Sequence, residues 1–258
     1  MAADLRLSRW PEPLAAAVFR CGDDFELLAH QGPMDEMGEW ASVSKLAVAW
    51  LAHHRGSDLT SPLGPESSTL AHVLSHCSGL GSSADALGAR VGTKRIYSTY
   101  GYELALNFLS DERGPTFLVS TMNSMLGTSV ESDGTAAGGL RGSLRDLLML
   151  ANEWVVLSRS ASEWVVPFLP EIGGIVPGFG PFTPNPWGLG PELKGDKQHW
   201  MGRHWSAESL GHFGQSGSLL LIDPIAHIGV VALSRIPFGA WAVPLFGEWT
   251  DEVWEMWR

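Results

Sequence analysis

The chain has 258 residues, and its 45% hydrophobic and 17% charged content is typical of a folded protein that buries a large core in one or two domains. Its net charge of −11 comes without any run of Lys and Arg, which argues against nucleic acid or an anionic membrane as a partner. The N-terminal residues do not form the apolar segment of a secretory signal, and no apolar run is long enough to cross a bilayer. With only two cysteines, Cys21 and Cys77, we expect a cytoplasmic protein with reduced thiols.

The N-terminal third predicts a β-hairpin followed by a helix. Two apolar runs at 15–20 and 25–29 flank a turn-rich linker at 21–24, which is the pattern of two paired strands. An apolar, helix-like run covers about 42–54, and a connector rich in Pro, Gly and Ser follows at 56–68.

The spacing of apolar residues predicts further helices in the middle of the chain, at about 70–76, 101–109, 115–125 and 143–157. The segment 173–191 is dense in Gly and Pro and predicts a long ordered loop. Apolar runs at 219–222 and 228–233 predict a second pair of strands, and 244–257 predicts a closing helix.

Strands at both ends with helices between them indicate an α/β fold of the α+β type. Neither pair of strands is enough for a stable sheet alone, so we expect both ends to share one antiparallel sheet, with the closing helix packed across it. We expect a single unit over 1–258, with an α/β lobe of about 1–55 and 185–258 and a helical lobe of about 56–184.

The first candidate site lies at the start of the 42–54 helix. Ser42 and Lys45 are three residues apart, which places them on one face of a helix. A Ser hydroxyl needs a nearby base to act as a nucleophile, and a Lys amine serves when burial lowers its pKa. This predicts acyl-enzyme chemistry, although the same spacing arises about once by chance in a chain of this length.

Three more segments follow in order along the chain, and with 40–45 they form four motifs. These three segments are 74–80 (Leu-Ser-His-Cys-Ser-Gly-Leu), 96–102 (Ile-Tyr-Ser-Thr-Tyr-Gly-Tyr) and 211–218 (Gly-His-Phe-Gly-Gln-Ser-Gly-Ser). The four motifs resemble those of the penicillin-recognising serine hydrolases, and more narrowly the class C β-lactamase, D-peptidase and family VIII esterase group. The resemblance covers nearly the whole chain and implies a β-lactamase/transpeptidase-like fold, in which helices flank an antiparallel sheet and form an insertion lobe.

The resemblance implies a role for each matching residue. Ser42 would be the acylated nucleophile, and Lys45 would take or share its proton. Tyr97 would be a second acid/base, kept partly anionic by cationic neighbours, and His212 would tune this proton network from the adjacent strand. The backbone N–H groups of Ser42 and Gln215 would form the oxyanion hole.

Three departures from the family pattern bear on the substrate. Thr99 stands where the family usually has Asn, Phe213 replaces a Thr, and His212 replaces a Lys of the third motif. Each change removes a polar contact suited to a β-lactam or a D-Ala-D-Ala terminus, at a cost of about 1–3 kcal/mol. Gly214 would let the strand approach the substrate closely. We therefore expect an esterase on small acyl esters, with no cofactor and no metal.

Several alternatives remain. The first is a β-lactamase or D-Ala peptidase-like amide hydrolase, and the second is a non-catalytic binding protein that keeps this fold. The segment 214–218 is a near miss of a nucleophile elbow, but the strong strand follows it instead of preceding it. His72 and His76 have a metal-ligand spacing without a third ligand, so a structural role for His76, bonding the loop near the site, is favoured. The sequence leaves the oligomeric state open.

Overall fold

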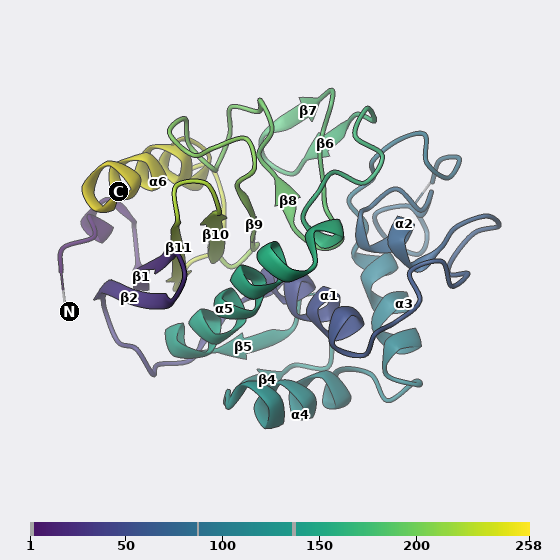
Figure 1. Cartoon of the computed structure of the whole chain (residues 1–258), viewed down its shortest axis with the longest axis horizontal. Coiled ribbons are helices and arrows are strands. Elements are labelled where there is room, and N and C mark those ends of the chain that lie inside the picture. Colours follow the sequence, from purple (N-terminus) through teal and green to yellow (C-terminus); the bar gives the residue numbers. More distant parts are fainter. Residues whose placement is uncertain (1–2, 87, 136–137) are drawn as a thin grey trace.

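The computed structural model describes residues 3–86, 88–135 and 138–258, and its centre is a six-stranded antiparallel sheet (Figure 1). The strands run in the spatial order β2 (Phe25–Gln31), β1 (Pro13–Cys21), β11 (Ile228–Ser234), β10 (Leu219–Asp223), β9 (Leu210–Phe213) and β8 (Glu192–Leu193). Strand β1 pairs directly with β11, with Val18 opposite Val230. The prediction that both ends of the chain share one sheet is therefore confirmed.

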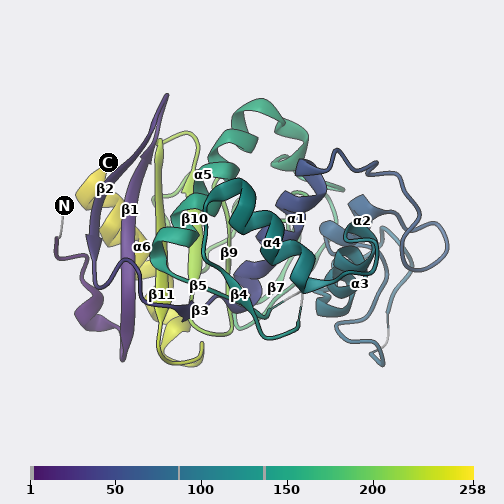
Figure 2. The ribbon, with the colours of Figure 1, turned by 90° about the horizontal axis from the view of Figure 1, so that it is seen from below.

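Both faces of this sheet are buried. Successive residues of β11 alternate between two apolar clusters, with Val230 in one and Val231 in the other, because neighbouring side chains of a strand point to opposite faces. Helix α5 (Leu144–Ser160) packs on one face with α1 (Ser44–His54) beside it, and α6 (Ala242–Trp257) packs on the other (Figures 1 and 2). The sheet is thus the middle layer between two sets of helices.

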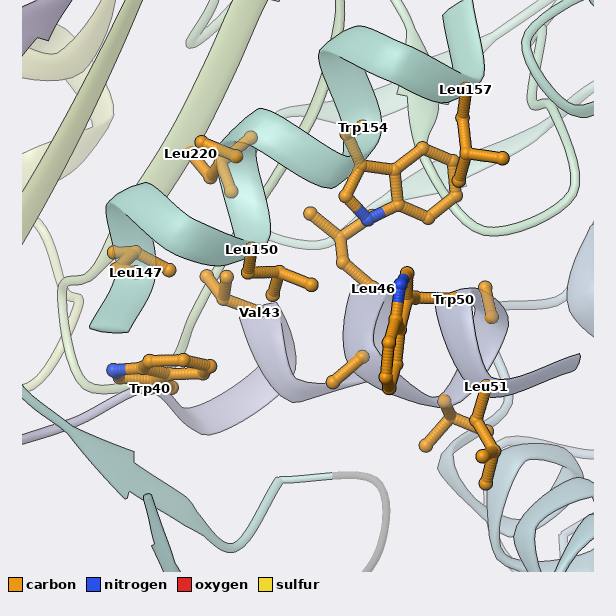
Figure 3. Packing of buried hydrophobic residues seen from close by; sticks show 14 of the residues in the cluster. Trp40, Val43, Leu46, Trp50, Leu51, Leu147, Leu150, Trp154, Leu157 and Leu220 are labelled. Atoms are coloured by element: carbon orange, nitrogen blue, oxygen red, sulfur yellow. The ribbon is translucent and has the colours of Figure 1, made fainter. Parts of the chain in front are cut away.

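The helix that follows the candidate nucleophile is held by apolar contacts on all sides. Every residue of α1 from Ser44 to Ala52 is buried, as expected for a helix that is apolar all round. Figure 3 shows Leu46 and Trp50 of α1 packed against the side chains of α5, which include Trp154. This packing fixes where the N-terminal end of α1 lies relative to the sheet.

The remaining elements lie outside the central sheet and helices α1, α5 and α6. They are η1 (Leu7–Arg9), β3 (Gly38–Glu39), η2 (Ala41–Val43), α2 (Leu70–Leu74), α3 (Thr99–Leu109), α4 (Pro115–Leu126), β4 (Glu131–Ser132), β5 (Leu140–Gly142), η3 (Ser162–Trp164), β6 (Gly174–Val176) and β7 (Gly180–Phe182). Helices α2 and α3 lie at one end of the molecule, and α6 lies at the other end (Figures 1 and 2). Both chain termini lie near α6. The division into two lobes stays a prediction.

Two expectations need correction. The helix expected over about 42–54 begins as the 3-10 turn η2 and becomes an α-helix only at Ser44. The segment 173–191 is not a single loop, because β6 and β7 pair within it as a hairpin. No helix within the described ranges has the length and apolar character needed to span a membrane.

Candidate active site

Ser42 lies in the turn η2, immediately before α1. The preceding residue, Ala41, has φ 44°, a left-handed conformation that is unfavourable for a residue with a side chain. Lys45 lies in the first turn of α1, fully buried, and its Nζ donates a hydrogen bond to Ser42 Oγ at 3.2 Å. The structure therefore brings the hydroxyl and the amine together.

Burial changes the protonation of Lys45. It lowers the pKa of the amine to about 7, while the carboxylate of Glu103 on α3 acts in the opposite direction. The amine lies 4.9 Å from the centre of the Tyr97 ring and 5.8 Å from that of Tyr102, at cation–π distance. At neutral pH a substantial fraction of Lys45 is therefore unprotonated and able to accept a proton from Ser42.

Tyr97 and His212 form the second part of the site. The Tyr97 hydroxyl lies 3.4 Å from Nε2 of His212, which is on β9. Nδ1 of His212 lies 2.7 Å from the Phe213 carbonyl oxygen, which can only accept, so Nδ1 carries the proton and Nε2 accepts from Tyr97. Burial, assisted by the charge of Lys45, lowers the pKa of His212 to about 3. His212 is therefore a neutral acceptor near neutral pH.

Tyr97 is a phenol in this environment. Burial raises the pKa of its hydroxyl above the usual value, and a hydrogen bond with Ser42 only partly opposes this effect. The expectation of a partly anionic Tyr97 is not supported. Lys45 is the better base for Ser42, and Tyr97 is better suited to donate a proton.

A small cavity of about 60 Å³ opens beside Ser42. It is lined by Ser42, Tyr97, Pro177, Trp187, Glu192, His212, Phe213 and Gln215. A cavity of this size holds a few heavy atoms, whereas pockets for drug-sized ligands measure about 300–1,000 Å³. A larger surface hollow of about 930 Å³ lies between α6 and residues 198–204, and its lining does not include Ser42. The chemistry-bearing groups gather at the small cavity, which is therefore the candidate site.

Two backbone N–H groups beside this cavity have no acceptor among the described residues. In the turn between β9 and β10, Gly214 donates to Ser218 and Gly217 donates to Gly214, while the N–H of Gln215 stays unpaired within the described chain. The N–H of Ser42 likewise has no described acceptor. Two such donors on separate elements can hold an oxyanion between them.

Gly214 makes a close approach, but not to the open cavity. A Cβ at this position would lie 2.4 Å from the Trp40 carbonyl oxygen and 2.5 Å from Ser218 Oγ. Ser218 Oγ donates to the same Trp40 carbonyl at 2.7 Å. The absence of a side chain therefore lets the β9–β10 turn contact the backbone just before Ser42.

The two substituted motif positions differ in their placement. Thr99 is exposed at the first residue of α3 and does not line the cavity. Phe213 does line it, and its ring packs against Phe179 and Phe238 at centroid distances of 5.6 Å and 5.0 Å. The structure thus brings Phe213 into the site and leaves Thr99 outside it.

Sequence reasoning missed a buried ionic cluster next to the cavity. Glu192 accepts hydrogen bonds from Lys197 Nζ at 2.5 Å, His199 Nε2 at 2.9 Å and Trp200 Nε1 at 2.9 Å. Lys197 also donates to Asn185 Oδ1 at 2.8 Å. Burial opposes ionisation of Glu192, but Lys197 and His199 outweigh it and hold the pKa of the carboxyl below its usual value. Charged residues in a Gly-rich segment look solvated in a sequence, so only the fold reveals this cluster.

Arg95, two residues before Tyr97, was also missed. Its guanidinium is buried and donates to the carbonyl oxygens of Asn185 at 2.6 Å, Phe168 at 2.9 Å and Ser75. These bonds join three loops around the segment that carries Tyr97.

The two histidines with metal-ligand spacing have separate environments. His72 Nδ1 lies 2.8 Å from Thr69 Oγ1, whereas His76 is buried against Tyr97. Across the described ranges, no group of three or more His, Cys, Asp or Glu residues is arranged to hold a metal ion.

Comparison with known proteins agrees with the fold. No protein-family model and no curated protein matches the sequence. A crystal structure of a β-lactamase from Mycobacterium bovis matches with a TM-score of 0.87 and 34% identity, covering 97% of both chains. Simvastatin synthase from Aspergillus terreus matches with a TM-score of 0.68 and 14% identity, over 97% of this chain and 95% of that one. A D-amino acid amidase from Ochrobactrum anthropi matches with a TM-score of 0.66 and 17% identity, over 94% and 92% of the two chains. With 34% identity to the M. bovis protein over nearly the whole of both chains, this chain belongs to the penicillin-recognising serine hydrolases of the β-lactamase fold.

Proposed function

We propose that this protein is an esterase that forms an acyl-enzyme on Ser42 and acts on small, uncharged acyl esters. The observation that carries the proposal is the hydrogen bond from Lys45 to Ser42, with an amine that titrates near neutral pH. This pair stands beside a cavity of about 60 Å³ that has room for a short acyl chain.

In the acylation step, Lys45 acts as the base and Tyr97 acts as the acid. Unprotonated Lys45 takes the proton of Ser42 as Ser42 Oγ attacks the ester carbonyl carbon, and the N–H groups of Ser42 and Gln215 stabilise the oxyanion. Tyr97 donates its proton to the leaving alcohol oxygen, and the proton on Lys45 then restores Tyr97. The C–O bond to the alcohol breaks, and an ester bond to Ser42 takes its place.

Deacylation repeats this chemistry with water in place of the alcohol. Lys45 accepts a proton from the water as its oxygen attacks the acyl carbon, and Tyr97 returns a proton to Ser42 Oγ as the acyl bond breaks. The proton on Lys45 then returns to Tyr97, which leaves a carboxylic acid and the free enzyme.

The charges around the cavity favour an uncharged substrate. The described lining residues include no Lys and no Arg, and His212 is neutral because burial lowers its pKa to about 3. Lys197, the cation nearest to Glu192, is held by Glu192 and Asn185 and is not among the lining residues, so it is not placed to bind a substrate carboxylate. These features disfavour β-lactams and peptides ending in D-Ala, both of which carry a carboxylate.

A second candidate function is hydrolysis of amides, including β-lactams. It is supported by the 34% identity with a protein described as a β-lactamase, and by the fold shared with a D-amino acid amidase. A third is binding without turnover, supported by the replacement of polar motif residues at Thr99 and Phe213.

Hydrolysis of p-nitrophenyl acetate and butyrate tests the proposal. We expect turnover by the wild type and a loss of at least about 10³-fold in Ser42→Ala, because the nucleophile is gone. The thermal midpoint should change little, because a small, partly exposed side chain contributes little packing. Ser120→Ala, at an exposed serine on α4, is the matched control and should keep full activity.

Three results would count against the proposal. Retained turnover in Ser42→Ala would mean that another residue carries the chemistry. Efficient nitrocefin hydrolysis would favour the amide-hydrolase alternative. Failure of a fluorophosphonate to label Ser42, read by mass spectrometry, would favour binding without turnover.

A further inference from the structure

Two hydrogen bonds hold the backbone on either side of Tyr97, and both end on one residue. The N–H of Ile96 donates to the carbonyl oxygen of His76 at 2.8 Å, and the N–H of Ser98 donates to Nδ1 of the His76 ring at 3.1 Å. The His76 ring also packs on the Tyr97 ring, with 4.5 Å between centroids. His76 therefore contacts Tyr97 through its ring and anchors both of its chain neighbours.

The bond from Ser98 determines the tautomer of His76. A backbone N–H only donates, so Nδ1 carries no proton and the neutral ring is protonated at Nε2. That Nε2 is buried and has no hydrogen-bond partner among the described residues. The indole of Trp187, which lines the cavity, lies perpendicular to the ring at 4.7 Å. The same imidazole thus contacts the phenol and one wall of the cavity.

Burial and nearby cationic groups keep the His76 ring neutral. Burial, together with the cationic groups of Lys45 and Arg95, holds the pKa of His76 well below its usual value, against a smaller effect of Glu192. A proton on Nδ1 would place two donors face to face and break the bond with Ser98. The arrangement is therefore maintained at neutral pH.

His76 keeps these contacts in a strained backbone conformation. Its φ of 59° lies in the left-handed region, which is uncommon for residues other than Gly, although Asn, Asp and His are enriched there. Such strain persists when the surroundings hold the residue in place. Here those surroundings are the segment around Tyr97.

We propose that His76 is a positioning residue that holds the Tyr97 phenol in hydrogen-bond reach of Ser42 and His212. Its kinetic consequence rests on the proposed esterase function: loss of the Nδ1 acceptor displaces the proton donor and lowers kcat more than it changes KM. The backbone geometry around Tyr97 does not depend on any substrate and is tested separately.

Two variants separate the ring acceptor from the backbone strain. His76→Asn keeps a residue suited to positive φ and places an amide oxygen near the position of Nδ1. His76→Gly removes the ring without strain and keeps the carbonyl that pairs with Ile96. If His76→Gly does not fold, His76→Leu removes the same acceptor and takes its place. His72→Asn, on the same segment but not in contact with Tyr97, is the control.

The kinetic experiment uses p-nitrophenyl acetate. A displacement of about 1 Å at a reacting group costs about 100-fold, so we expect kcat of His76→Gly to fall by about this factor, with KM changed less than about 3-fold. His76→Asn should stay within about 10-fold of the wild-type kcat, and His72→Asn should equal the wild type. Equal losses of kcat in the Asn and Gly variants would overturn the proposal.

The second readout needs no turnover. The chain has only three tyrosines, so 3-fluorotyrosine gives three fluorine resonances, which Tyr→Phe variants assign. We expect the H2O/D2O isotope shift of the Tyr97 resonance to increase in His76→Gly, as the phenol becomes exposed, and to stay near the wild-type value in His76→Asn. An unchanged shift in a folded His76→Gly or His76→Leu protein would overturn the proposal. The fluorine measurement tests the position of Tyr97 even if the wild type hydrolyses no ester. A lack of ester hydrolysis would count only against the proposed function.

Discussion

Burial shifts the pKa values of Lys45 and Tyr97 in opposite directions for one physical reason. Low-dielectric surroundings disfavour the charged form of both groups, so the pKa of the amine falls to about 7 while that of the phenol rises. Near neutral pH, Ser42 therefore has an unprotonated amine on one side and a protonated phenol on the other. One base and one acid are therefore available beside Ser42.

This assignment predicts the pH dependence of turnover. Ester hydrolysis should rise as the pH increases through about 7, because Lys45 must lose its proton to accept one from Ser42. In Lys45→Arg the guanidinium stays charged throughout this range, so the rise should disappear and the rate should fall about 10²–10⁴-fold. Initial rates between pH 5 and 9 measure both effects.

The control for this experiment is Lys94→Arg. Lys94 is exposed, and the substitution should leave the pH profile unchanged. A Lys45→Arg profile with the same rise near pH 7 would show that a different group is the base.

At the scale of elements, the site depends on two contacts between segments. The β9–β10 turn touches the backbone before η2 through Gly214, and the Glu192–Lys197 pair joins β8 to the segment that follows it. Gly214→Ala is designed to disrupt the first contact, and Lys197→Met is designed to disrupt the second.

Gly214→Ala should disturb stability and activity together. The added Cβ would meet backbone and side-chain atoms at 2.4–2.5 Å, so the turn or η2 must move, and we expect a loss of about 1–3 kcal/mol in the free energy of unfolding. The kcat should also fall, because the Gln215 N–H and Ser42 are displaced. Gly22→Ala, where a Cβ meets nothing within 4 Å, is the control for denaturation and kinetics. Wild-type stability in Gly214→Ala would contradict this account of the turn.

Lys197→Met should leave a buried carboxylate without its cation. Breaking a buried pair costs about 3–5 kcal/mol, so we expect a loss of this size in urea denaturation. The loss should shrink at low pH, where Glu192 takes up a proton. Arg20→Ala breaks an exposed pair with Glu26 at the same 2.5 Å distance, and should cost about 1 kcal/mol or less. Equal losses in the free energy of unfolding for Lys197→Met and Arg20→Ala would mean that the buried pair stabilises the fold no more than the exposed pair does.

At the scale of the whole molecule, the N-terminal and C-terminal segments pack against each other and against the same sheet. Strands β1 and β11 pair, and α6 packs on the sheet face opposite α5. Trp249 of α6 is fully buried, and its Nε1 donates to the Leu5 carbonyl at 2.7 Å. The stability of the sheet that carries His212 therefore depends on both ends of the chain.

Trp249→Ala should destabilise the fold without changing the chemistry. We expect a loss of about 3–5 kcal/mol in the free energy of unfolding, because a large buried ring is removed. None of the described residues lining the cavity comes from α6, so the kcat of the folded protein should change little. Val243→Ala, on the exposed side of the same helix, should stay within about 0.5 kcal/mol of the wild type. A large fall in kcat of folded Trp249→Ala would show that α6 affects the site.

Local patterns in the sequence predicted most of the elements. Helices α3, α4, α5 and α6 lie within about three residues of their expected bounds, because the period of their apolar residues reflects the face that each helix buries. The β6–β7 hairpin was missed because its strands of three residues are too short to show an alternating pattern. The 3-10 start of α1 was missed because it depends on how Trp40 and Ala41 are packed.

The sequence by itself identified Ser42, Lys45, Tyr97 and His212 as candidate site residues. The spacing of Ser42 and Lys45 puts them on one helical face, and the ordered motifs pointed to Tyr97 and His212 before any contact was known. These inferences depend on neighbours along the chain or on short motifs.

Only the tertiary structure decided the state and the surroundings of these groups. The protonation of Lys45 and Tyr97 depends on burial by segments far away in the sequence, and the placement of Thr99 outside the cavity depends on how α3 packs. The two bonds from His76 to the segment around Tyr97 span about twenty residues. Such effects depend on distances between atoms from different parts of the chain, and a linear pattern does not contain those distances.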